Sequence, residues 1–436
     1  MSRSRLSDHQ TTVRFLVIGM IVLAMLIPLA MVEGVTEERQ SFFDMTLRDV
    51  ANAWGNAQNL SGPFLVIPEE HRRQVKQKNG SLVWRTQTHN RVYLPSRLGM
   101  KAVVTHQFRK RSIYEVPVYL AQLRFEGVFP ALDPENLNLT GVNVRLDQAR
   151  IVVGVSHTQA ISSASPLRLG AVEAPFRSGT GQAWIGSGVH VALERYEGNE
   201  SQSFAFELQL KGTRQFGFTP VGGNTEVEMT STWPHPSFDG NYLPESYEVR
   251  EDGFTARWVV HELARNLPAS WRVERREVQL EDSYAWISLF QPVTEYTIVD
   301  RAIKYGLLFI ALTFLGFVCF ELCTALLFHP VQYGVIGMGL VLFYLALLSL
   351  SEHLDFGLSY LIATTLLTVL ISWYVRMMTG SNRLAGLMAL IVAVLYSTLY
   401  VLLQLEAFAL LVGTAVLFAG LMVLMATTRT LTQRAG

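Results

Sequence analysis

YGLLFIALTFLGFVCFELCTALLF (residues 305–328) opens the stretch that decides the fold. From residue 305 to residue 428 the side chains are almost all apolar, and only six acidic or basic residues interrupt them. About 20 apolar residues cross a bilayer as a helix, so this stretch is long enough for five crossings. The six charged residues are Glu321, Glu352, Asp355, Arg376, Arg383 and Glu406. The sequence therefore predicts a membrane bundle and a separate water-facing domain in the remainder.

Composition agrees with an integral membrane protein. Half of the 436 residues are hydrophobic and the formal net charge is zero, so no basic excess indicates a nucleic-acid partner. The two cysteines, Cys319 and Cys323, both lie in the apolar stretch and are interpreted as small apolar fillers. A water-facing domain without cysteine must be held together by its core. The sequence predicts no cofactor and no metal, and the lipid bilayer is the first expected partner.

The arrangement of apolar runs predicts six membrane spans. The first covers residues 15–32, and because no small-x-small cleavage motif precedes Glu33 we expect an anchor rather than a signal peptide. The other five are predicted at residues 305–328, 331–351, 356–376, 384–404 and 406–427. One span thus precedes the polar part of the chain and five follow it.

Basic residues predict the orientation of these spans, because cytoplasmic loops are enriched in Lys and Arg. Arginine marks three ends that would be cytoplasmic: Arg3, Arg5 and Arg14 before the first span, Arg376 and Arg383 between the fourth and fifth, and Arg429 and Arg434 after the last. Arg301 and Lys304 depart from this pattern and are interpreted as reaching to lipid headgroups. Residues 33–300 are therefore predicted to be periplasmic, with both termini cytoplasmic.

The polar part begins with a helical stalk, predicted at residues 33–60. Phe43, Leu47, Val50 and Trp54 recur on one helical face, and Gly62-Pro63 is expected to end the helix. Residues 61–300 then form a β-rich domain, 301–428 the five-helix bundle and 429–436 a cytoplasmic tail.

Alternation of apolar and polar residues predicts the β structure. Residues 204–210 and 254–260 alternate strictly, and 113–125 is a longer run of the same type. Shorter strands are predicted at 63–68, 92–94, 151–155, 189–193 and 227–229. One buried and one wet face indicate mostly antiparallel sheets in a sandwich or barrel-like stack, built as one large domain or two smaller ones. The fold class is thus an α+β membrane protein.

Two motifs in the β-rich part contain residue types that can carry chemistry. His261-Glu262 lacks the second histidine that a zinc protease needs at position 265, where this chain has Arg265. Trp233 and His235 lie in a Trp-Pro-His-Pro segment that is either a binding lip or a packed turn. No phosphate-binding glycine loop or nucleophile elbow is present in the sequence, so no catalytic residue is predicted.

Polar residues in the membrane half are a second candidate site. Glu321 lies within a predicted span, where burying its charge against lipid would cost at least about 2.5 kcal/mol. The turn residues are His329, Gln332 and Tyr333, then Glu352 and His353, then Gln404 and Glu406. Together they predict either a proton or ion path, or helix capping with one hydrogen-bonded interior glutamate.

Several blocks together resemble the CreD-type inner-membrane protein family of Gram-negative bacteria. In the membrane half they are RAIKYGLLFIAL (301–312), HPVQY (329–333), LLSLSEH (347–353), ISWY (371–374) and YVLLQLE (400–406). In the polar half they are LSGPFLVIP (60–68), IYEVPVY (113–119), WPHPSFDGNYLP (233–244) and DGFTARWVVHELARNLP (252–268). The resemblance implies a large periplasmic domain and a role in envelope integrity or stress response, and it supplies no catalytic or ligand residue.

These observations predict a non-enzymatic inner-membrane protein. Its periplasmic β domain would bind or sense an envelope component or a membrane protein partner, while the bundle anchors it. The alternative is a transporter or a flux protein for an ion or lipid that uses Glu321 with His329 or Glu352. An envelope hydrolase is the weakest hypothesis, because the sequence nominates no nucleophile with a base.

Overall fold

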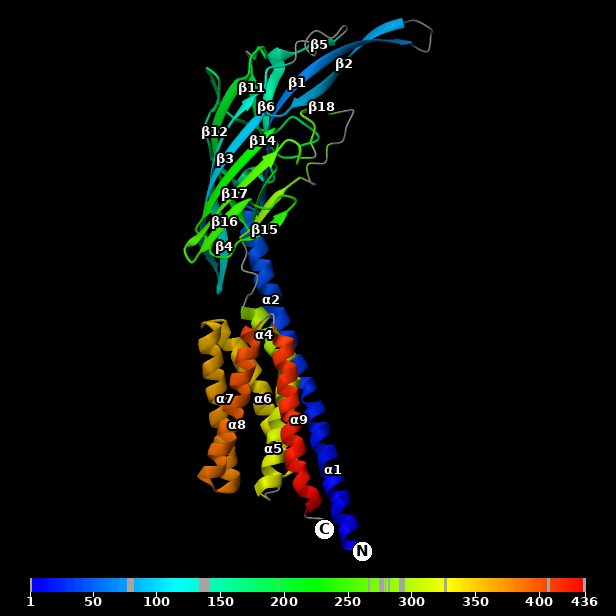
Figure 1. Cartoon of the computed structure of the whole chain (residues 1–436), viewed down its shortest axis with the longest axis vertical. Helices are drawn as coiled ribbons and strands as arrows, with labels where there is room; N and C mark the ends of the chain where they lie inside the picture. The colour runs from blue at the N-terminus through cyan, green and yellow to red at the C-terminus, as the bar shows by residue number, and fades with distance from the viewer. Residues whose placement is uncertain are drawn as a thin grey trace. The chain divides into compact units, whose positions relative to one another are not determined.

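The computed structural model describes residues 2–76, 82–132, 142–194, 196–265, 267–273, 278, 280, 283–289, 295–324, 328–405 and 408–433. They divide into two compact units. The first, here called the membrane unit, comprises Met1–Asp44 and Pro292–Gly436, and the second, the β unit, comprises Met45–Gln291. Figure 1 shows that helices build the first and strands the second. The α+β class is thereby confirmed.

Helices account for the described part of the membrane unit. They are α1 (Ser2–Ala24), α2 (Leu26–Trp54), α4 (Glu295–Lys304), α5 (Gly306–Thr324), α6 (Pro330–Ser351), α7 (Phe356–Thr379), α8 (Asn382–Gln404) and α9 (Ala409–Gln433). Only the turn at Met25 separates α1 from α2, and the backbone bonds from Met25 N to Ile21 O and from Leu29 N to Met25 O continue across it. The predicted first span and stalk therefore form a nearly continuous helix.

The number of membrane spans differs from the predicted six. Within the described residues, four helical segments are long and apolar enough to cross a membrane, and a fifth is obtained if α4 and α5 count as one span. These two helices meet at Tyr305 with a bend of 49°. The apolar part of α9, Leu411–Ala426, is shorter than a typical span. The six-span count is therefore not confirmed.

Two β-sheets, of ten and nine described strands, form the β unit. Sheet A has the order β10 (Arg177–Ser178), β11 (Gly188–Leu193), β6 (Ala149–Val155), β1 (Gln58–Lys76), β13 (Gln215–Phe218), β19 (Ala285–Ser288) and β15 (Ser237–Gly240), with β2 (Leu82–Tyr93), β5 (Val142–Val144) and β18 (Ser270–Arg272) attached. Sheet B has the order β16 (Ser246–Arg250), β17 (Gly253–His261), β14 (Asn224–Ser231), β3 (Arg97–Arg111), β4 (Tyr114–Phe129), β12 (Gln202–Thr213), β8 (Leu167–Leu169) and β9 (Val172–Ala174), with β7 (Ile161–Ala164) attached. Most pairs are antiparallel, whereas β1–β13 and β14–β3 are parallel.

Alternating burial explains why these residues form strands. In β12 and β14 every second side chain is buried, as the sequence pattern predicts. One expectation was wrong: Gly62-Pro63 does not end the stalk, because α2 already ends at Trp54 and β1 begins at Gln58. The pair lies inside β1, where the register against β6 shifts between Ser61 and Phe64. An irregularity of this kind accommodates a proline, which cannot donate to the strand ladder.

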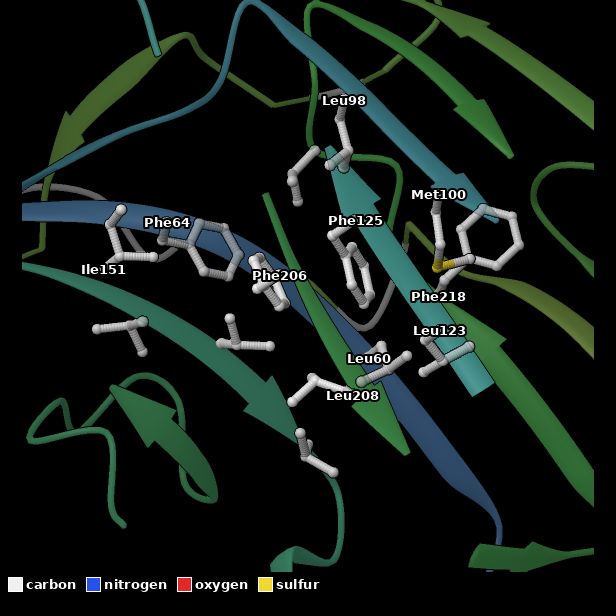
Figure 2. Close-up of a cluster of buried hydrophobic side chains, with 14 of the residues drawn as sticks. Leu60, Phe64, Leu98, Met100, Leu123, Phe125, Ile151, Phe206, Leu208 and Phe218 are labelled. Carbon is white, nitrogen blue, oxygen red and sulfur yellow. The ribbon is translucent and has the colours of Figure 1, made fainter. Parts of the chain in front are cut away.

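Both sheets contribute to one hydrophobic core. Figure 2 shows the side chains of Leu60, Phe64 and Ile151 from sheet A near Phe206 and Leu208 from sheet B. The rings of Phe125 and Phe206 stack with centroids 4.7 Å apart. Burial of this kind contributes about 25 cal/mol per Å² of apolar surface, so the core fixes the frame that carries the polar features described next.

Candidate functional site

The carboxylate of Glu321 is held by helix α1 and by the turn before α6. Arg14 of α1 donates from Nη2 to Glu321 Oε1 at 2.6 Å and to the carbonyl oxygen of Phe328 at 2.7 Å. The backbone N–H of Phe328 donates to the same Oε1 at 2.6 Å. The Glu321 side chain is only 7% exposed. The acid is therefore paired and hydrogen-bonded, which is how a buried charge is tolerated at membrane depth.

Aromatic side chains surround this carboxylate. Tyr333 is buried and interacts electrostatically with Glu321. Its ring lies 5.6 Å from that of Phe314 and 6.4 Å from that of Phe328. The structure thus brings two of the predicted residues, Glu321 and Tyr333, into one cluster.

His329 and Gln332 form a capping box at the start of α6. His329 Nδ1 accepts from Val331 N at 3.3 Å, and Gln332 Oε1 accepts from His329 N at 2.7 Å. Pro330 occupies the first turn, where its missing N–H is not needed. These hydrogen bonds of both side chains are those of a helix cap.

The other predicted membrane residues lie at helix ends. Glu352 follows α6 and forms an ion pair with Arg39 of α2, with Oε1 and Nε 3.5 Å apart. His353 is exposed in the turn that Asp355 closes by accepting from Gly357 N at 3.0 Å. Gln404 is the exposed last residue of α8, and Glu406 lies outside the described residues.

The Trp233 segment has the geometry of a packed turn. Trp233 is buried, and its indole N–H donates to the carbonyl oxygen of His235 at 2.9 Å. Its ring also lies 5.5 Å from that of His106. His235 is exposed, but Trp233 offers no surface for a binding lip.

The His-Glu motif at the end of β17 has the arrangement of a structural cluster. Arg265 is buried, donates to the carbonyl oxygen of Val221 and lies 3.4 Å from Glu262. Among the described residues no group of three or more His, Cys, Asp or Glu is placed to hold a metal.

A buried carboxylate that sequence reasoning missed fixes three strands of the β unit. Glu69 of β1 is 1% exposed and accepts from Arg91 Nε of β2 at 2.5 Å and from Arg272 Nε of β18 at 2.8 Å. His71 Nε2 lies 3.2 Å from Glu69 Oε2, the oxygen that also accepts from Arg272. Burial raises the pKa of Glu69, but the hydrogen bonds and charges of Arg91, His71 and Arg272 outweigh this and hold the pKa below its usual value. The carboxylate is therefore charged at neutral pH.

The end of α2 is fixed in the β unit by Trp54. Two cations lie over its ring, with Arg109 Cζ at 4.2 Å and Lys211 Nζ at 4.8 Å from the centroid. The indole N–H donates to the carbonyl oxygen of Tyr119 at 3.3 Å. The last residue of the helix is thereby attached to strands β3, β4 and β12.

We expect Trp54→Ala to lower the unfolding free energy of the β unit by about 2 kcal/mol, because two cation–π contacts of about 0.5–1 kcal/mol each and one hydrogen bond are lost. Trp54→Phe keeps an aromatic face and should lose about half as much. Thermal and denaturant unfolding of the full chain, followed by circular dichroism, measure the difference. Equal stability of Trp54→Ala and the unsubstituted chain would contradict this role.

Sequence comparison places the chain in a known group. The sequence model of the family described as inner membrane protein CreD matches residues 10–432. The inner membrane protein CreD of Escherichia coli (strain K12) is 31% identical over 410 residues, which are 94% of this chain and 90% of that protein. The chain belongs to the CreD family. The resemblance read from the sequence blocks is thereby confirmed, and CreD membership identifies an inner membrane protein of the cell envelope.

Comparison with solved structures returns distant likenesses. An M1 zinc metallopeptidase from Deinococcus radiodurans has a TM-score of 0.25 and 10% identity, with 44% of this chain and 41% of that one covered. A putative protease from Parabacteroides distasonis has a TM-score of 0.25 and 11% identity, with 51% and 45% covered. The chain spans less than half the length of these proteins, and no property of theirs is carried over to this CreD protein.

Proposed function

We propose that this protein binds an envelope component through its β unit on the periplasmic side, and that the membrane unit anchors it and transmits occupancy. In this role it contributes to envelope integrity or to a stress response. No enzymatic step is part of the proposal.

The continuity of helix α2 carries the proposal. Within the membrane unit α2 is fixed by the ion pair from Arg39 to Glu352 and by the contact of Phe43 with Tyr296, whose ring centroids are 6.2 Å apart. Its last residue, Trp54, makes cation–π contacts with Arg109 and Lys211 in the β unit. A single helix fixed at both ends can pass a displacement in one unit to the other, because helices transmit rigid-body shifts.

The contacts of Glu321 favour anchoring over transport. A carboxylate that carries protons or ions needs a polar path to water, and rare acids in membrane helices commonly mark one. Here Glu321 Oε1 already accepts hydrogen bonds from Arg14 Nη2 and from Phe328 N, and the His329 side chain caps helix α6. We therefore expect Glu321→Gln to leave the envelope phenotype unchanged when the protein level is normal, whereas a flux mechanism requires its loss.

Site-specific photocrosslinking tests the binding role. A crosslinking amino acid at an exposed position of the β unit, such as Thr86, should capture the same envelope component reproducibly from living cells. The matched control carries the crosslinker at Leu361 of α7, an exposed residue on an apolar helix. Crosslinks from the β unit that do not exceed those of this control would contradict the proposal.

Orientation gives a separate expected result. With Cys319 and Cys323 replaced by alanine, Ser237→Cys of the β unit should react with a membrane-impermeant maleimide in intact cells. Arg383→Cys, which is exposed between α7 and α8, should react only after the inner membrane is permeabilised, as arginine-rich cytoplasmic turns predict. Labelling of Arg383→Cys but not of Ser237→Cys in intact cells would show the opposite orientation in the membrane and would contradict the proposed function.

A further inference from the structure

Strands β1 and β2 continue well past the rest of sheet A. In Figure 1 they run together beyond the labels of β5 and β18. On the side of β1, the neighbouring strand β5 ends its pairing at His71, which lies opposite Val142. On the side of β2, the neighbouring strand β18 pairs only with Arg91 to Tyr93. Residues 72–76 therefore pair with residues 82–86 and with no other described strand. We call this two-stranded segment the ribbon.

The ribbon exposes apolar side chains that a water-facing hairpin does not need. Leu82 is 62% exposed, Trp84 63% and Val83 39%. The other described tryptophans of the β unit are buried or half-buried. An isolated two-stranded hairpin is at best marginally stable in water. Exposed apolar side chains add no stability to it, because burial is what makes them stabilising. A partner that covers them would supply that burial.

The ribbon is also strongly basic. Its residues, 72–76 (RRQVK) and 82–86 (LVWRT), contain four Lys or Arg and no Asp or Glu, in a chain whose net charge is zero. Arg72 and Arg85 are both exposed. Their positive charge, which no acidic residue of the ribbon balances, is complementary to a negative surface.

We propose that the ribbon docks on an anionic phospholipid surface. This inference rests on the proposed function, since it gives a chemical class to the envelope component that the β unit binds. Tryptophan is enriched at membrane interfaces, and basic residues near anionic lipid are attracted to it. Leu82 and Trp84 share one face of the strand about 7 Å apart, so both side chains can enter the headgroup boundary together, as the apolar face of an interfacial segment does.

A lipid surface fits these residues better than an anionic sugar polymer. A polymer can stack on Trp84 and pair with the arginines, but it leaves Leu82 in water. The acyl boundary of a bilayer takes up both Leu82 and Trp84 on their common face, while the headgroups meet Arg72 and Arg85. The base of the ribbon is fixed in sheet A, because Glu69 of β1 pairs with Arg91 and Arg272 three residues before the ribbon begins. The ribbon can therefore hold its exposed side chains in a defined position.

Flotation of the full chain tests the inference. The protein is reconstituted in phosphatidylcholine nanodiscs and mixed with vesicles of phosphatidylcholine, with or without phosphatidylglycerol. We expect stronger binding to the phosphatidylglycerol vesicles, weakened by added salt. Arg72→Gln combined with Arg85→Gln should weaken it about 25-fold, at about fivefold for each basic residue. Trp84→Ala should weaken it at least about tenfold, through lost apolar burial.

Matched controls come from sheet B. Tyr247 of β16 is also 63% exposed, and Tyr247→Ala should bind vesicles as the unsubstituted chain does. Arg250→Gln with Arg257→Gln removes the same charge from exposed positions and should weaken binding far less than the ribbon pair. All variants change exposed side chains, so each should retain the thermal unfolding midpoint of the unsubstituted chain.

The ribbon could also bind the bilayer of the nanodisc that holds the protein, which flotation with vesicles does not detect, so a second measurement is needed. Amide hydrogen exchange of residues 82–86 should slow in phosphatidylglycerol nanodiscs relative to phosphatidylcholine nanodiscs. Absence of both protection and flotation overturns the inference, as does Trp84-dependent binding to purified peptidoglycan without binding to vesicles. If the ribbon variants bind lipid normally while photocrosslinking from the β unit still captures an envelope component, this inference fails and the proposed function stands. If the ribbon variants bind lipid normally and photocrosslinking captures no envelope component, both this inference and the proposed function are wrong.

Discussion

Replacing Glu321 by alanine is expected to lower the unfolding free energy of the membrane unit by about 3–5 kcal/mol, the effect of removing one partner from a buried ion pair. The loss has two parts. Arg14 retains its bond to the carbonyl oxygen of Phe328 but loses its carboxylate, and the N–H of Phe328 loses its acceptor. Unpaired groups of this kind are more costly at membrane depth than in water.

A double-mutant cycle separates the pair from its surroundings. Glu321→Gln keeps an oxygen that can accept from Phe328 N and should cost less than Glu321→Ala. Replacing Arg14 and Glu321 together by leucine leaves no unpaired charge, so this variant should be much closer in stability to the unsubstituted chain than either single leucine variant. Unfolding in nanodiscs, followed by the circular dichroism of the helices, measures the unfolding free energies of the unsubstituted chain, the two single leucine variants and the double leucine variant. Additive losses would contradict a direct interaction between the two side chains.

The helices of the membrane unit could be predicted because their signals are local. The predicted spans 331–351 and 356–376 correspond to α6 (Pro330–Ser351) and α7 (Phe356–Thr379). Continuous apolar sequence defines the helices, and His329 and Asp355 cap their starts. The predicted stalk failed at its end because Gly62-Pro63, a strong turn signal, was accommodated by an irregularity inside β1.

The candidate site was only half predictable. Glu321 stands out in the sequence because an acid within an apolar run is costly. Its partner Arg14 lies 307 residues away, among the arginines that already explain the orientation of the first span. Their common position near the cytoplasmic ends of two predicted spans was the one available signal for the pair. No local pattern links Glu69 with Arg272, which are 203 residues apart.

The ribbon was missed for a related reason. Strand prediction relies on one buried and one wet face, but residues 82–88 are exposed on both faces. What makes them a strand is their pairing with β1, which continues from a buried part of sheet A. The polar and basic composition was visible in the sequence, whereas its presentation on a paired ribbon was not.

Glu69→Ala is the second substitution for which we expect a large loss, about 3–5 kcal/mol in the unfolding free energy of the β unit. The carboxylate is buried and bridges Arg91 and Arg272, so its removal leaves two cations close together without a counter-charge. Glu69→Gln should recover little, because its amide group offers one oxygen to two donors and adds two N–H groups of its own.

The next residue in β1 provides a matched control. Glu70 also pairs with an arginine, Arg145, at 2.7 Å, but its side chain is 27% exposed. Solvent screens an exposed pair, so Glu70→Ala should change stability far less than Glu69→Ala. Denaturant unfolding of the full chain, followed by β-sheet circular dichroism, compares them. Equal losses for the two variants would mean that Glu69 acts only as a surface charge.

Acid should reduce the difference between the unsubstituted chain and Glu69→Gln. Because Arg91, His71 and Arg272 hold the pKa of Glu69 below the ordinary value of 4.5 in the folded chain, the unfolded chain binds the proton more readily. The stabilisation is therefore fully present above pH 4.5 and is lost as the pH falls through the lower folded-state pKa. Glu69→Gln has no such proton to bind, so its unfolding free energy should fall less steeply over the same acidic range. Glu70 and Asp147, whose pKa values are also lowered by pairing with Arg145, are unchanged in both chains and contribute equally to each. A constant difference between the two chains across this range would show that the ionised form of Glu69 does not stabilise the β unit.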